Sequence, residues 1–252
     1  MGRAKEIIVK VIPSKIANQF VKKWHYSGKV AANSQLHFGA FLDGSLHGVM
    51  SYGPSLDKRK IQILVKDTGW NEFLELNRMA FDDYLPKNSE SRCISISIKL
   101  LKKNAPHIKW IISFSDGAQC GDGTIYRASG FLLTGIKKND QMWKAPNGEV
   151  FSRASLTGPK AKIEQKKALQ ICDKLGAKGA NMRDTGKASM EIYKNAGFKP
   201  IPGYQIRYIY FIDKSKKQDL NVPILPFSTI DKMGAGMYKG EKIPISERNK
   251  SA

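Results

Sequence analysis

The stretch richest in reactive side chains runs from Ile111 to Gly135, IISFSDGAQCGDGTIYRASGFLLTG. A strand-like apolar segment carries Ser113, Ser115 and Asp116, and the loop after it contains Gln119 and several glycines. Open α/β sheets place ligands beyond the carboxyl ends of their strands, so Asp116 is a candidate proton acceptor, with helix capping as the alternative. Ser113, Ser115 and Gln119 are candidate hydrogen-bond donors to a carbonyl oxyanion.

Glu75 is a second candidate for handling a proton. It lies in a predicted strand over residues 73–81, FLELNRMAF, where leucines alternate with polar residues. Because side chains along a strand point alternately to opposite faces, Glu75 should share a face with Asn77 and Met79. That face is either simply solvated or directed into a wet cleft, where the carboxylate could act as a base.

His25 is the third candidate, and it precedes Tyr26 in the stretch WHYSG. An ordinary loop pair is the alternative interpretation. The four histidines show no His-x-x-x-His spacing, and Cys93, Cys120 and Cys172 lie far apart without a Cys-x-x-Cys pair. Neither a zinc module nor a disulfide framework is indicated, and the metal ligands stay unassigned.

The charge balance indicates a polyanionic partner. The 252-residue chain has 42 Lys and Arg residues against 22 Asp and Glu, a formal net charge of +20 and a pI near 9.8. Basic doublets such as Lys22-Lys23 and Lys166-Lys167 are spread along the chain, which favours a folded basic surface over a charged tail. Nucleic acid is the partner that such a surface favours, and a merely lysine-rich solvated surface is the alternative.

The chain lacks the segments typical of membrane or secreted proteins. It has no apolar run of about eighteen residues, and its first residues, MGRAKEIIVKVIP, lack the apolar stretch and cleavage site of a secretory signal. The hydrophobic fraction of 41% suffices for a buried core. We therefore expect a folded cytoplasmic protein with no membrane partner.

The elements that must position these residues alternate along the chain. A hairpin turning at Asp43-Gly44 precedes the strand over 73–81. Residues 89–104 alternate like a strand but also carry a helical stripe, and a cap at Asn88 or Ser89 favours a helix. The elements predicted downstream are a strand over 107–116, a short helix over 123–130, a strand over 131–135, a hairpin turning at Asn147-Gly148, helices over 161–176 and 187–197, and a strand over 204–212.

This order of hairpin, strand, helix, strand, helix and strand resembles the core of the GNAT acyltransferase superfamily, as does the Tyr-x-x-x-Gly-Phe ending from Tyr126 to Phe131. The resemblance implies a mixed α/β fold with a largely antiparallel central sheet flanked by helices. It implies a coenzyme A site at the start of the helix over 89–104, with Ser91, Arg92 and Ile94 as candidate cofactor-binding residues. The loop before that helix, LPKNSESRCIS, lacks the glycines of the superfamily's pyrophosphate-binding turn.

A longer resemblance covers nearly the whole chain. Its pieces are WHYSG, HFGAFLDGSLHGVMSYG, LELNRMAF, SISIKLLKK, ISFSD, IYRASGFLLTG, FSRASL and GFKPIPGYQIRYIYFID, with VPILPFS and GAGMYKG near the end. On these the chain is identified as a member of the phage Mom DNA-modification family. The resemblance implies a GNAT-like catalytic domain over residues 1–215 with a C-terminal extension over 216–252, packed on it or partly mobile.

What this resemblance implies about function is modification of adenine at N6 in phage DNA, which shields the DNA from host restriction. The product is a methylcarbamoyl or carbamoylmethyl adenine, the donor an acyl-coenzyme A or related compound, and iron is the implied metal. Double-stranded DNA with a flipped adenine is the expected partner, and a dimer is left open. The candidate catalytic residues are His25, Tyr26, Glu75, Ser113 and Asp116, and the candidate substrate-binding residues are Arg78, Ser115, Gln119, Gly121, Gly123, Tyr126, Trp143 and Arg153.

Aromatic side chains and glycines have specific expected roles in that reaction. Trp24, Tyr26, Tyr126 and Trp143 could stack on an extruded base, although each is more often a half-buried core or rim residue. Gly117, Gly121 and Gly123 could let the chain approach a base or donor closely. Two other functions stay open from the residues: a non-enzymatic basic protein that coats or bends DNA, and a GNAT enzyme acting on a small amine or peptide.

Overall fold

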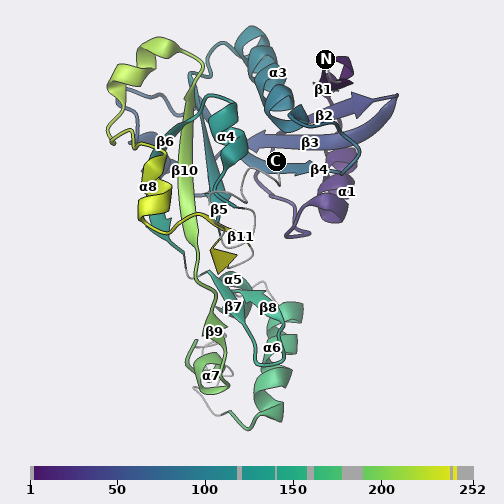
Figure 1. Ribbon diagram of the computed structural model, residues 1–252, viewed down its shortest axis with the longest axis vertical. Helices are drawn as coiled ribbons and strands as arrows, with labels where there is room; N and C mark the ends of the chain where they lie inside the picture. Colours follow the sequence, from purple (N-terminus) through teal and green to yellow (C-terminus); the bar gives the residue numbers. More distant parts are fainter. Residues whose placement is uncertain are drawn as a thin grey trace.

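The computed structural model describes residues 3–117, 121–139, 141–157, 162–177, 190–238 and 241–242. Its centre is a seven-stranded sheet in the order β1-β2-β3-β4-β5-β10-β6, in which β4 and β5 are parallel and all other neighbours are antiparallel (Figure 1). The strands are β1 (Ile8–Val11), β2 (Leu36–Leu42), β3 (Ser45–Gly53), β4 (Phe73–Phe81), β5 (Trp110–Asp116), β6 (Leu132–Lys138) and β10 (Tyr204–Phe211). The predicted fold class, a mixed and largely antiparallel sheet flanked by helices, is confirmed.

Helices cover both faces of this sheet. They are α1 (Ser14–Trp24), α2 (Lys58–Gln62), α3 (Ser89–Asn104), α4 (Thr124–Ala128) and α8 (Ser228–Lys232), with a short 3₁₀ helix η1 (Arg3–Glu6) at the start. On one face, α3 and α4 pack their apolar side chains against Met50, Leu76 and Leu133. On the other face, α1 packs Ala17 and Val21 against the sheet.

The ambiguous segment 89–104 is a helix, as predicted. Ile94, Ile98 and Leu101 are buried along one stripe, which matches the helical period of the apolar positions. The expected side-chain cap is absent at this helix: Asn88 has a φ of 67° and makes no capping hydrogen bond. Ser89 does not cap either, because its hydroxyl donates to the carbonyl of Pro86.

Both predicted hairpins are present. Asp43 and Gly44 have φ values of 51° and 78°, the left-handed pair that a tight two-residue turn requires, and they join β2 to β3. Asn147 and Gly148 lie in the turn between β7 (Met142–Lys144) and β8 (Val150–Ser152).

The described residues between 142 and 200 form a second, smaller lobe between β6 and β10, which lies beyond one end of the main sheet (Figure 1). Besides β7 and β8, it contains α5 (Arg153–Thr157), α6 (Lys162–Lys174), α7 (Met190–Asn195) and β9 (Lys199–Pro200). Its core is separate from that of the main sheet and contains Trp143, Phe151, Cys172, Tyr193 and Phe198.

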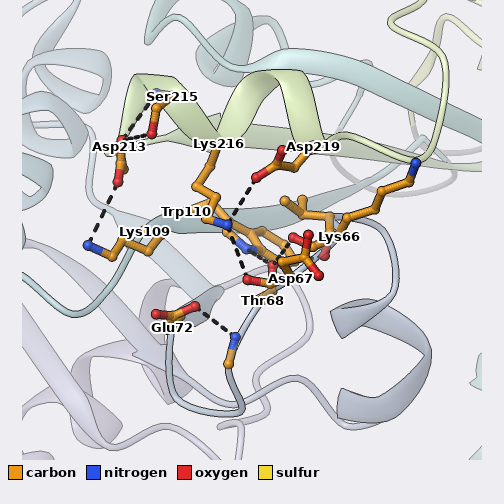
Figure 2. A network of polar contacts seen from close by, with 12 residues as sticks. Lys66, Asp67, Thr68, Glu72, Lys109, Trp110, Asp213, Ser215, Lys216 and Asp219 are labelled. Atoms are coloured by element: carbon orange, nitrogen blue, oxygen red, sulfur yellow. Dashed lines mark hydrogen bonds and ion pairs between the residues drawn. The ribbon is translucent and has the colours of Figure 1, made fainter.

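The segment after β10 packs on the main sheet. It forms the 3₁₀ helix η2 (Lys214–Asp219), then α8, β11 (Met237–Tyr238) and β12 (Glu241–Lys242), and Ile230 and Ala235 join the main core. Figure 2 shows how η2 is tied to the loop before β4: Lys216 Nζ donates to the carbonyl of Asp67 at 3.1 Å and pairs with Asp219 at 3.0 Å. The division into residues 1–215 and 216–252 stays a prediction. None of the helices in the described ranges is long and apolar enough to cross a membrane.

Candidate functional site

The central feature of the site is the point where β4 and β5 separate. The two parallel strands pair only from Phe73 opposite Trp110 to Glu75 opposite Ile112. Just beyond, the hydroxyl of Ser113 donates to the carbonyl of Leu76 at 3.3 Å. Glu75 therefore occupies the last position of β4 that pairs with β5, and the two strands separate beyond it.

A β-bulge in β4 gathers polar side chains beside Glu75. Ser51 of β3 pairs with Arg78 and Tyr52 pairs with Leu76, so Asn77 is an extra residue in β4. A bulge brings two successive side chains to one side of a sheet. Asn77 and Arg78 accordingly lie on the side of Glu75, whereas Met79 packs into the core on the opposite face. The prediction that Met79 shares the face of Glu75 was wrong for this reason.

The carboxyl of Glu75 is held in a partly buried polar pocket. Burial raises its pKa, while the nearby polar side chains of Ser55 and Asn77 and the charge of Arg78 act in the opposite direction. The amide oxygen of Asn77 in turn accepts a hydrogen bond from Ser34 Oγ at 3.1 Å. A carboxylate whose pKa is raised toward the working pH is suited to accept a proton from a substrate.

His25 lies at the end of α1 and is fixed by its own chain. Its Nδ1 accepts from the backbone N–H of Ser27 at 3.2 Å and lies 2.8 Å from the Ser27 hydroxyl. Burial, and then the charge of Arg78, lowers the pKa of His25 to about 4. Because a backbone N–H can only donate, Nδ1 carries no proton, and the neutral ring carries its proton on Nε2. The imidazole thus offers an N–H donor.

Arg78 links the two groups and the smaller lobe. Its Nε donates to the carbonyl of Lys29 at 3.0 Å and its Nη1 to the carbonyl of Asn77 at 2.7 Å. The ammonium of Lys29 pairs with Glu164 of α6 at 2.7 Å and reaches Ser155 Oγ of α5 at 3.3 Å. The loop that follows His25 is thereby held between β4 and the smaller lobe.

Asp116 lies at the carboxyl end of β5 and belongs to the same face of the sheet as Glu75. Side chains alternate along β5, and Ile112 packs with Phe73 on that face. Asp116 is four residues beyond Ile112, the partner of Glu75, so the two acids lie about 13 Å apart along the strand direction. Asn139 Nδ2 donates to Asp116 Oδ1 at 3.4 Å.

Ser113 and Ser115 lie on the opposite face, beneath α3 and α4, and Tyr126 of α4 packs against that face. Ser113 is fully buried, and Ser115, 2% exposed, donates to the carbonyl of Gly121 at 2.6 Å. The Tyr126 ring packs against Phe131 and Tyr208, with centroids 5.5 and 5.3 Å away. The structure therefore separates the predicted site residues into an open group around Glu75 and a buried group in the core.

Gly123 has a structural reason to be glycine. Its φ is 78°, and a Cβ there would lie 2.6 Å from the ring of Tyr208. Gly148 has a similar φ of 89°, but a Cβ there would meet nothing within 4 Å. We expect Gly123→Ala to lower the free energy of unfolding by about 1–3 kcal/mol more than Gly148→Ala, since only the first adds overpacking to the backbone strain. Denaturant unfolding of both variants measures the difference, and equal losses would contradict it.

The candidate cofactor residues lie in the first turns of α3. Ser91 Oγ donates to the carbonyl of Asn88 at 3.2 Å, and Arg92 Nη2 donates to the carbonyl of Lys5 at 3.2 Å. Ile94 is fully buried in the core. Asn88, with its positive φ, takes the left-handed conformation that glycine often supplies in such a turn.

Trp143 and Arg153 belong to the smaller lobe. Trp143 is 5% exposed and anchors the core of the lobe. Together with Met190, Lys194, Phe198 and Pro200, the two residues line a surface hollow of about 360 Å³. Gln119 lies outside the described residues, as does Cys120.

The described part of the chain does not fit the iron that the resemblance implies. Within it, no group of three or more His, Cys, Asp and Glu side chains is placed to hold a metal ion. Nδ1 of His25 lies 2.8 Å from the Ser27 hydroxyl, and Nδ1 of His47 lies 2.9 Å from Asp82 Oδ2. No step below is routed through a metal.

Four residues of the site carry no motif in the sequence: Lys29, Ser34, Ser55 and Asn77. Asn77 could have been noted from its alternation with Glu75. The others come from loops that meet β4 only in the folded chain, so no local pattern marks them.

Comparisons with known proteins place the chain in a family. Among solved structures, it is similar to a Bacillus subtilis acetyltransferase in complex with CoA (10% identity, TM-score 0.41, covering 81% of this chain and 98% of that one). It is also similar to a GNAT family acetyltransferase from Elizabethkingia anophelis with acetyl-CoA bound (12% identity, TM-score 0.40, covering 81% and 97%). These scores are too low to support an argument about donor or substrate.

The sequence matches are stronger. The chain is 30% identical over 222 residues to a protein of Escherichia phage Mu named methylcarbamoylase mom. The matched residues make up 88% of this chain and 82% of that protein. The family model of the Mom protein family matches residues 6–229. The chain therefore belongs to the Mom protein family.

Proposed function

We propose that the protein is a transferase that places a methylcarbamoyl (carbamoylmethyl) group on N6 of adenine in phage DNA and so protects that DNA from host restriction. The observation that carries the proposal is the open polar group of His25, Glu75, Asn77 and Arg78 in a chain so similar to a named methylcarbamoylase. The net charge of +20 supports a DNA substrate.

The chemistry required matches what these side chains offer. The lone pair of N6 is delocalised into the purine ring, so the amine needs a base as it attacks. We assign Glu75 as the group that takes the N6 proton. N6 adds to the carbonyl carbon of the donor's methylcarbamoyl group to form a tetrahedral oxyanion, and this intermediate collapses as the bond from that carbon to the leaving group breaks, so that the methylcarbamoyl group stays on N6 and the leaving group departs with the electron pair.

His25 and Arg78 act on charge that develops during the reaction. The Nε2–H of a neutral His25 donates a hydrogen bond to the oxygen of the donor's carbonyl, as preorganised donors do in oxyanion holes. The nearby Arg78 guanidinium favours the negative charge at that oxygen and the ionised form of Glu75. The donor belongs to the acyl-coenzyme A class or a related class. Ser91 and Arg92 of α3 would contact the phosphate groups of such a donor.

The target adenine must leave the duplex to reach this group. Tyr26 is 53% exposed, and its ring lies 4.3 Å from the ring of His25, so it is suited to stack on an extruded base. Tyr126 is buried, and we assign it to the core beneath the site. Asp116, further along the same face, is assigned to the substrate path rather than to the same proton as Glu75.

Nucleoside mass analysis tests the proposal. DNA from cells that express the protein should contain a modified deoxyadenosine, and this nucleoside should disappear with His25→Ala or Asp116→Ala. Ile163→Ala, which changes an 86% exposed residue on α6, is the matched control and should leave the yield unchanged. Unmodified DNA despite good expression of folded wild-type protein would reject the transferase and favour a non-enzymatic DNA-binding protein.

A further inference from the structure

Leu56 is a strongly exposed apolar side chain in the turn that follows β3. It is 91% exposed, which makes it more exposed than any other large hydrophobic residue of the described chain. We propose that Leu56 is a wedge that enters the DNA stack and fills the space left by the target adenine. The inference rests on the proposed function, because it assumes an adenine that leaves the duplex.

The segment that follows β3 carries Leu56 and begins next to Glu75. Gly53, the last residue of β3, pairs directly with Glu75. Two residues later, Ser55 is buried at 6% exposure, close enough to the Glu75 carboxyl to lower its pKa, and its hydroxyl has no hydrogen-bond partner within the described residues. Leu56 is the next residue and is exposed, so in this proposal it contacts the DNA close to the base that reaches Glu75.

The turn that carries Leu56 is held tightly. Asn33 Nδ2 donates to the carbonyl of Pro54. A Cβ on Gly53 would lie 2.1 Å from the carbonyl oxygen of Asn33, so the loop before β2 and the end of β3 are in close contact. A wedge must keep its position while it separates stacked nucleobases. These contacts hold in place the backbone from which the Leu56 side chain extends.

The charges next to Leu56 are complementary to a DNA backbone. Lys58, Arg59 and Lys60 follow in α2, and Lys58 lies over the ring of Trp70, 4.5 Å from its centroid, with Trp70 50% exposed. Lys60 also pairs with Asp57 at 2.6 Å and Lys58 donates to Asn71 at 3.3 Å, so Arg59 is the principal phosphate contact of the proposal. Proteins that kink DNA or extrude a base combine such phosphate contacts with an inserted apolar side chain.

Single exposed leucines are common on protein surfaces, so position and charge carry the argument. Ile163 is 86% exposed but belongs to α6 of the smaller lobe and not to the segment next to Glu75. Leu56→Ala and Ile163→Ala thus remove similar apolar area from different places. Both positions are exposed, so neither substitution should affect folding, and Leu56→Met keeps a wedge of similar size.

Duplexes with 2-aminopurine in place of single adenines report base extrusion without any donor, because the probe fluoresces when it leaves the stack. Wild-type protein, Ile163→Ala and Leu56→Met should raise the fluorescence at saturating protein, and Leu56→Ala should reduce that rise at least about fivefold. In cells, Leu56→Ala should lower the yield of modified deoxyadenosine about tenfold. Equal fluorescence and equal yield for Leu56→Ala and wild type would overturn the wedge.

The two proposals fail differently. If wild-type protein raises the fluorescence in a Leu56-dependent way but leaves DNA unmodified, the wedge stands and the transferase is rejected. If wild type modifies DNA and Leu56→Ala does so equally well, the transferase stands and the wedge is rejected. A wild-type protein that neither modifies DNA nor raises the fluorescence overturns both.

Discussion

Glutamine in place of Glu75 is expected to lower the rate of adenine modification by about 10²–10⁴-fold, the usual contribution of a general base. The amide keeps the size of the side chain and its contacts with Ser55 and Asn77 but cannot take a proton. Glu75→Asp, which keeps the base on a shorter arm, should recover part of the rate. The yield of modified deoxyadenosine and the rate with purified protein measure the loss.

The pH dependence separates a base from a structural carboxyl. Burial raises the pKa of Glu75 above its usual 4.5, so the ionised fraction and the rate should rise with pH through the raised value. The folded state holds this proton more tightly than the unfolded chain, so Glu75 makes stability fall as pH rises through that window. Glu75→Gln should therefore be at least as stable as wild type at neutral pH.

Glu149→Gln is the matched control, because it removes a half-buried acid of the smaller lobe that pairs with Lys167 at 2.6 Å. It should retain the wild-type rate and pH profile. A Glu75→Gln variant that also retains both would show that Glu75 is not the base.

Replacing His25 by asparagine is expected to lower the rate by about 10²–10³-fold, whereas glutamine should keep it within about tenfold of wild type. The side-chain N–H of glutamine can reach the position of Nε2, and that of asparagine can reach only the position of Nδ1. Because His25 is proposed as a donor and not as a base, the N–H is what must be kept. Parallel rate measurements on the two variants decide this.

Acid sensitivity provides a second readout for His25. Its pKa is lowered to about 4, so the folded state binds fewer protons than the unfolded chain between pH 4 and the ordinary value of 6.5. The stabilisation is complete above pH 6.5 and is lost as pH falls toward 4. His25→Gln should lack this part of the pH dependence of unfolding. If glutamine is as inactive as asparagine, the imidazole acts as a base and the assignment is wrong.

Much of the fold could be predicted because its signals are local. The turns at Asp43-Gly44 and Asn147-Gly148 need left-handed residues, and the sequence supplies them at those places. The stripe of Ile94, Ile98 and Leu101 has a helical period, and it is buried as that period requires. Each signal is contained within a few residues, so the order of strands and helices could be read in advance.

The grouping of the site residues could not be predicted in the same way. Alternation placed Met79 with Glu75, but the extra residue in β4 exists only through pairing with β3, and it turned Met79 to the other face. Alternation in β5 likewise puts Ser113 on the face opposite Asp116, although both had been expected in one site.

The sequence by itself determined the family, the order of the elements and the candidate acids and histidine. The tertiary structure decided which of them meet, that Ser55 and Asn77 join them, and that His25 is neutral with its proton on Nε2. The physical reason is that turn and helix signals act over a few residues. The face to which each side chain of a bulged strand points, the burial of a carboxyl and the tautomer of an imidazole all depend on segments that meet only after folding.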